Sequence, residues 1–177
     1  AEHEELPVFG ITPDADFPAI YGEKGILTAE LRMPLKNSGL LTAVGGTAAN
    51  VVPSLCSVTY AGTDGRPVTV QAKGKPAHGS TPEDGVNAIS AVMEKLELKS
   101  AFVDFYQTYI GWDYHGVKMG CGLEDDKSGK LTLNAGVLTV DGEDLLLKLN
   151  IRNPVTFTTE DAMGPVRAAA AGYGMSV

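Results

Sequence analysis

The chain has 177 residues, 44% of them hydrophobic, so it can bury a sizeable core as one domain or as two small ones. Its net charge of -8 argues against nucleic acid or an anionic membrane as the main partner. No apolar run approaches the length of a membrane span, and no signal peptide opens the chain. Cys56 and Cys121 lack metal-type spacing, so we expect small buried residues and a cytoplasmic protein.

Alternation of apolar and polar residues predicts strands in the first half of the chain. The pattern covers residues 27–33 and residues 56–60, where every second side chain is apolar. Asp64-Gly65 predicts a hairpin turn that leads into a third strand over residues 68–72. These strands indicate a sheet with one face in the core.

The segment Gly74–Ala88, GKPAHGSTPEDGVNA, sets a histidine between a strand and a helix. Thr81 is expected to cap a helix that begins at Pro82, and apolar residues recur at helical spacing as far as Leu96. His78 would then occupy a Gly-flanked turn between two rigid elements. The position favours a functional histidine, and a histidine that only fills the turn is the alternative.

A second hairpin is expected after this helix. It joins residues 131–140 to residues 145–151 across the turn Asp141-Gly142. Residues 158–161, TTED, predict the start of a last helix. Gly164 and Pro165 follow closely, so the conformation of the first helical turn stays open. Antiparallel strands with segregated helices predict an α+β layer fold with helices packed on one face.

Candidate functional residues occur at four places. Asp14 and Asp16 lie in a Pro-stiffened turn that suits a cation, although an aspartate after proline is commonly a turn residue. Asn50 precedes a strand as turn residues do, and its amide could donate to an oxyanion. His78 is the third candidate. Arg152, on the strand face opposite the apolar stripe, offers a fork of donors for a carboxylate or is simply solvated.

Four blocks of sequence stand in the order found in bacterial dipeptidases of the PepV type. They are PDADFPAIYGEKG (13–25), ANVVP (49–53), GKPAHGS (74–80) and LNIRNP (149–154). The chain resembles a family of co-catalytic zinc hydrolases that includes carnosinase, aminoacylase and succinyl-diaminopimelate desuccinylase. The resemblance implies that residues 1–24 end the first catalytic segment. Residues 25–177 would form most of a ferredoxin-like lid or dimerisation-type domain, as two small sheet-helix halves.

The resemblance also implies roles for the candidate residues. Asp14 matches a metal-ligand aspartate that would hold one of two zinc ions, with Asp16 the weaker candidate. His78 matches the lid histidine that helps to stabilise the tetrahedral oxyanion, and Asn50 the lid asparagine that supports substrate and oxyanion binding. Arg152 matches the lid arginine that grips the C-terminal carboxylate of a dipeptide. Zinc would polarise the carbonyl and generate hydroxide, while these donors complete the site on closure.

Several family motifs have no match in this chain. A His-x-Asp motif, an adjacent pair of glutamates in a strand-end setting and the last metal histidine are missing. We therefore expect the chain to be inactive alone and to need the remainder of the catalytic domain as a partner, besides the dipeptide substrate. A non-catalytic interaction or dimerisation module that retains the lid fold is the second hypothesis. Flanking sequence that carries the missing motifs would decide between the two.

Overall fold

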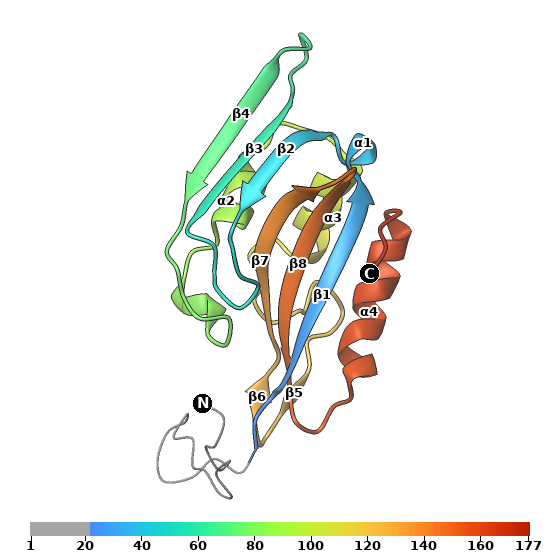
Figure 1. The fold of residues 1–177 in the computed structure, drawn as a ribbon. Coiled ribbons are helices and arrows are strands. Elements are labelled where there is room, and N and C mark those ends of the chain that lie inside the picture. The colour runs from blue at the N-terminus through green and yellow to red at the C-terminus, as the bar shows by residue number, and fades with distance from the viewer. Residues whose placement is uncertain (1–21) are drawn as a thin grey trace, which may run out of the picture.

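A six-stranded antiparallel sheet, in the order β1-β8-β7-β2-β3-β4, runs the length of the molecule (Figure 1). The computed structural model describes residues 22–177, so Asp14 and Asp16 lie outside the described residues. The strands are β1 (Gly25–Pro34), β2 (Leu40–Gly45), β3 (Leu55–Ala61), β4 (Pro67–Lys73), β7 (Thr132–Asp141) and β8 (Asp144–Asn153), with a separate hairpin of β5 (Glu124–Asp125) and β6 (Gly129–Lys130). The helices are α1 (Leu35–Ser38), α2 (Ala88–Lys95), α3 (Ala101–Tyr109) and α4 (Thr159–Gly172), with a 3-10 turn at Pro82–Asp84.

The longer helices α2, α3 and α4 lie against one face of the sheet (Figure 1). Leu145, Leu147 and Leu149 of β8 point into this layer and are fully buried, in one core with Phe102 of α3 and Val166 of α4. Burying such side chains is the main stabilising contribution to a fold of this kind. The predicted α+β fold, with antiparallel strands and helices on one face, is confirmed.

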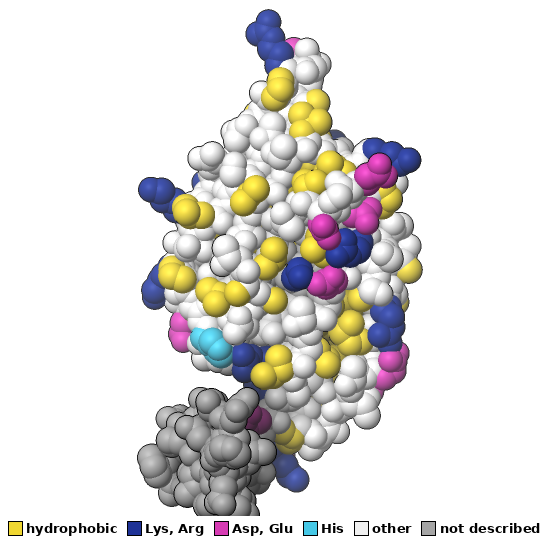
Figure 2. Space-filling model, viewed as in Figure 1, with side chains coloured by type: hydrophobic (Ala, Val, Ile, Leu, Met, Phe, Trp, Pro, Cys, Tyr) yellow, Lys and Arg dark blue, Asp and Glu magenta, His cyan; other side chains and the backbone are white. Residues whose placement is uncertain are grey.

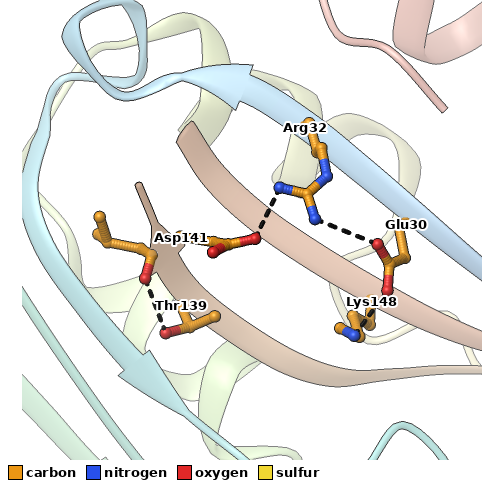
Figure 3. A network of polar contacts seen from close by, with 6 residues as sticks. Glu30, Arg32, Thr139, Asp141 and Lys148 are labelled. Carbon is orange, nitrogen blue, oxygen red and sulfur yellow. Dashed lines mark hydrogen bonds and ion pairs between the residues drawn. The ribbon is translucent and has the colours of Figure 1, made fainter. Parts of the chain in front are cut away.

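The opposite face of the sheet carries polar side chains around the β1–β8 pair. Glu30 Oε1 lies 2.6 Å from Lys148 Nζ, and Arg32 links Glu30 to Asp141 with an Nη1–Oδ2 distance of 2.8 Å (Figure 3). Figure 2 shows hydrophobic, basic and acidic side chains interspersed on this side of the molecule. Because water and salt screen such pairs, the network should contribute little to the free energy of unfolding.

Two three-stranded halves meet at the middle of the sheet. Only Val44↔Thr139 and Gly45↔Leu138 pair β2 with β7, whereas β1 pairs with β8 along all of its 10 residues. At this joint, a Cβ on Gly46 would lie 1.9 Å from the carbonyl oxygen of Gly136. Gly136 occupies a bulge in β7, and its own Cβ would lie 2.2 Å from Ala49 O. The halves therefore touch backbone to backbone, which only glycine permits.

The start of α2 differs from the prediction. Thr81 makes no side-chain cap, and the residues after it form only the short 3-10 turn. Val86 then pairs with Lys75 through two backbone hydrogen bonds of 2.9 Å, which keeps the chain extended. The helix begins at Ala88, two residues after Val86, and Asn87 Oδ1 caps it by accepting hydrogen bonds from the backbone N–H groups of Ile89 and Ser90. The prediction of Thr81 as the cap was wrong because a tertiary strand contact delays the helix.

Other local predictions hold more closely. Thr158 and Asp161 form the reciprocal capping box that opens α4, and the helix continues through Pro165. The hairpin turn at Asp64-Gly65 is confirmed between β3 and β4. The turn between β7 and β8 is shifted by one residue from Asp141-Gly142, since Asp141 still pairs with Asp144 and leaves Gly142 at the first turn position.

Within residues 22–177, no helix combines the length and the apolar character needed to cross a lipid bilayer.

The backbone contact at the joint predicts an asymmetry between two glycine substitutions. Gly136→Ala should lower the free energy of unfolding by roughly 1–3 kcal/mol, because its Cβ must displace the backbone of Ala49. Gly172→Ala is the control: an added Cβ at this position in α4 meets nothing within 4 Å, and alanine favours the helix by up to about 1 kcal/mol. Urea unfolding followed by circular dichroism measures both. Equal effects would contradict the close approach.

Candidate functional site

Asn50 and His78 lie on two loops that are bonded to each other. Val52 N donates to Ala77 O over 2.9 Å, and Gly79 N donates to Asn50 O over 2.7 Å. Val51 and His78 form an isolated antiparallel bridge between these contacts. Both candidate side chains are exposed. The loops therefore place Asn50 and His78 together, at the same end of the strands of the β2-β3-β4 half.

Arg152 joins them from the other half of the sheet. It lies near the end of β8, where it pairs with Ile26 of β1 and Thr132 of β7. Its Nη2 lies 3.5 Å from His78 Nε2, and Thr132 Oγ1 donates to Gly79 O over 3.2 Å. The structure thus brings together the three residues that the sequence singles out as lid residues.

Unsatisfied polar atoms gather at the same end of β8. Among the described residues, the buried side-chain atoms without a hydrogen-bond partner are Asn150 Oδ1, Arg152 Nε and Asn153 Oδ1. Leaving such an atom unpaired costs about 1–3 kcal/mol. The Nε of Arg152 is buried, whereas its Nη2 is only loosely engaged by His78, so the outer end of the guanidinium can still offer N–H groups to a carboxylate.

The glycine after His78 is required by packing. A Cβ on Gly79 would lie 2.8 Å from Asn150 Oδ1 and 3.0 Å from Asn50 O. Gly79 is buried between the loop and β8, whereas His78 beside it is exposed. The absent side chain therefore lets the histidine loop lie directly on the strand that carries Arg152.

A buried asparagine that the sequence analysis missed supports the Asn50 loop from below. Asn134 of β7 is fully buried, and its Nδ2 donates to Ala49 O over 2.8 Å and to Val51 O over 3.0 Å. These are the carbonyls on either side of Asn50. Asn134 Oδ1 in turn accepts from Nδ2 of Asn87, the capping residue of α2, over 3.3 Å. One network thus ties the start of α2, the sheet and the Asn50 loop together.

A signal for this network is present in the sequence. Thr132 and Asn134 are the polar residues within the otherwise apolar run from Leu131 to Leu138. They alternate with Leu131 and Leu133, so they share the strand face opposite the core. A buried amide on that face needs partners, and the loop carbonyls supply them.

Charged side chains of both signs lie around Lys24, near Arg152. Lys24 Nζ donates to Lys130 O over 2.5 Å. Partial burial lowers the pKa of Lys24; the carboxylates of Asp125 and Glu83 oppose this shift, and the nearby charge of Arg152 adds to it. Lys24 therefore interacts with two carboxylates as well as with Arg152, so its charge is partly balanced within the chain.

An apolar hollow adjoins the Asn50 loop. It has a volume of about 640 Å³ and is lined by residues 51–57 together with Val44 and residues 71–73. Val44 and Leu55, exposed by 67% and 61%, form part of its wall. An apolar recess beside a few converging polar groups is the usual composition of a small-molecule site.

Metal ligands are not grouped in the described part of the chain. Within residues 22–177, no three His, Cys, Asp or Glu side chains could hold a metal ion together. His115 has a structural contact, with Nδ1 at 3.0 Å from Leu131 O. Burial raises the pKa of Cys56 to about 12 and that of Cys121 to about 11, so both thiols stay protonated. The prediction of two small buried cysteines is confirmed.

Comparison with known proteins gives relatives over most of the chain. No protein-family model matches. The chain is 31% identical over 192 residues to Putative dipeptidase YtjP of Bacillus subtilis (strain 168), covering 88% of this chain and 42% of that protein. It is 30% identical over 213 residues to Putative dipeptidase SAB1611c of Staphylococcus aureus (strain bovine RF122 / ET3-1), covering 98% of this chain and 45% of that protein. The chain thus spans less than half the length of these curated relatives.

The Asn134 network predicts a large effect of a buried substitution. Asn134→Ala should lower the free energy of unfolding by at least about 2 kcal/mol, because it leaves two loop carbonyls without their partner and removes one of the two acceptors of the Asn87 amide. Hydrogen exchange at the Gly79 amide, which bonds to Asn50 O, should also accelerate. The control is Asn37→Ala, at an exposed position of α1, which should change stability by less than about 0.5 kcal/mol. Urea unfolding would contradict the network if both variants behaved alike.

Proposed function

We propose that this chain is the lid-bearing part of a zinc dipeptidase that hydrolyses the peptide bond of dipeptides, and that it is inactive without the remainder of the catalytic domain. The observation that carries the proposal is the meeting of His78, Asn50 and Arg152 at one end of the sheet. The dipeptidase names of the relatives support it. The setting is cytoplasmic, with a peptide rather than nucleic acid or a membrane as the partner.

The three side chains divide the recognition of a dipeptide. Arg152, whose Nη2 is only loosely engaged, binds the C-terminal carboxylate of the substrate. His78 donates to the scissile carbonyl oxygen as it becomes an oxyanion, and the amide of Asn50 donates to the same region. Because Arg152 and His78 approach within 3.5 Å, the carboxylate and the scissile carbonyl must lie close together, as they do when one residue follows the scissile bond.

Zinc would be held outside the described residues. Asp14 would supply one ligand, and the remaining ligands would come from the rest of the catalytic domain. When bound, two zinc ions supply Lewis-acid polarisation and a hydroxide nucleophile. The described residues are consistent with a lid, since the hydrogen-bond donors of His78 and Arg152 meet in it. Residues 22–177 contain no cluster of metal ligands.

The second candidate is a non-catalytic interaction or dimerisation module. The edge position of β4 favours it, because an edge strand offers unpaired backbone groups to another chain. The two functions separate in one experiment: a full-length protein that contains this chain and the missing metal motifs should hydrolyse dipeptides. A full-length protein that binds partners and shows no hydrolysis would establish the module instead.

The role of His78 is tested in that full-length enzyme. His78→Ala should lower kcat by on the order of a hundredfold or more, because one donor to the oxyanion is lost. The zinc content, measured by mass spectrometry, should stay unchanged. His115→Ala is the control, since the ring of His115 contacts the carbonyl oxygen of Leu131 rather than Asn50, His78 or Arg152, and it should leave kcat near its original value. Loss of zinc together with activity would make His78 a metal ligand.

The role of Arg152 is tested by changing the substrate as well as the residue. Arg152→Lys keeps the charge and loses the two parallel hydrogen bonds, so it should raise KM for free dipeptides much more than for the same dipeptides with an amidated C-terminus. Arg167→Lys serves as the control, because Arg167 pairs with Glu160 on the surface of α4. Steady-state kinetics on the two substrate series measures the difference. Equal losses on both series would reduce Arg152 to a solvated sheet residue.

A further inference from the structure

Ser80 holds one side of the His78 imidazole ring. Its Oγ lies 2.6 Å from His78 Nδ1, and its backbone N–H points to the same nitrogen over 3.4 Å. A backbone N–H can only donate, so this contact makes Nδ1 an acceptor, and the serine hydroxyl can then donate to it as well. If Nδ1 accepts, the proton of a neutral imidazole must sit on Nε2.

Arg152 acts on the ring in the opposite sense. A guanidinium has no acceptor, so its Nη2, at 3.5 Å from His78 Nε2, favours a bare Nε2 with the proton on Nδ1. The serine hydroxyl at 2.6 Å can donate or accept, so the groups that can only donate decide between the two. The backbone N–H of Ser80 is held by the main chain, whereas the guanidinium at the end of the longer Arg152 side chain can turn away from Nε2. The interaction with Ser80 should therefore outweigh the interaction with Arg152.

We infer that Ser80 is a positioning residue that holds His78 in the tautomer with its proton on Nε2. In that state the Nε2–H of His78 and the Nη2–H of Arg152 cannot bond to each other, and an oxygen acceptor between them would satisfy both. The use of Nε2–H toward an oxyanion rests on the proposed function. The tautomer itself exists without catalysis and can be measured on this chain alone.

The test is long-range proton–nitrogen NMR on the ¹⁵N-labelled 177-residue chain at about pH 9, where imidazole side chains are ordinarily neutral. His78→Gln assigns the His78 signals. The chain should show a protonated Nε2 and a bare Nδ1 at His78. In Ser80→Ala the ratio of Nε2–H to Nδ1–H should fall roughly three- to tenfold, the effect of one hydrogen bond. Ser80→Thr keeps a hydroxyl and should restore the ratio.

His115 provides an internal control. Its Nδ1 lies 3.0 Å from the carbonyl oxygen of Leu131, which can only accept, so His115 should carry its proton on Nδ1 in every variant. A His78 with its proton on Nδ1, or a ratio unchanged in Ser80→Ala, would overturn the inference. A full-length protein without dipeptidase activity would overturn the proposed function and leave the tautomer result standing, so the two failures are distinguishable.

Discussion

The backbone contact between the two halves of the sheet is the constraint on which the site depends. β2 and β7 share only two residue pairs, and the joint is completed by the approach of Gly46 to Gly136 and of Gly136 to Ala49. Side chains at these positions would separate the halves by the width of at least one methyl group. Without that approach, Asn134 would not reach the carbonyls that flank Asn50.

The site is assembled from both halves. The β2-β3-β4 half supplies the two bonded loops that carry Asn50 and His78, and the β1-β8-β7 half supplies Arg152. A small rotation at the joint would therefore change the distance between His78 and Arg152, although both halves contribute to one hydrophobic core. Binding an oxygen anion between these donors would in turn favour one relative position of the halves.

The two ends of β8 differ in what their side chains contribute to the molecule. Its buried leucines anchor the helices to the sheet, whereas its last residues leave Asn150, Arg152 and Asn153 with unpaired buried atoms among the described residues. Each such atom opposes folding, and the hydrophobic layer offsets that cost. Arg152 Nε is a donor and the two asparagine Oδ1 atoms are acceptors, so this end of β8 holds unused groups of both kinds.

The sequence by itself determined the features that depend on near neighbours. Period-two alternation identified β1, β3, β4 and β8, Asp64-Gly65 the hairpin, and the Thr158–Asp161 pattern the start of α4, because these structures form within a few residues. The central strand β2 was not predicted. Motif resemblance singled out His78, Asn50 and Arg152, although their roles stay predictions. Only the tertiary structure decided that Asn87 rather than Thr81 caps α2, that Asn134 supports the Asn50 loop, and that Arg152 meets His78. These contacts join residues from different strands and loops, so no local pattern specifies them until the sheet has formed.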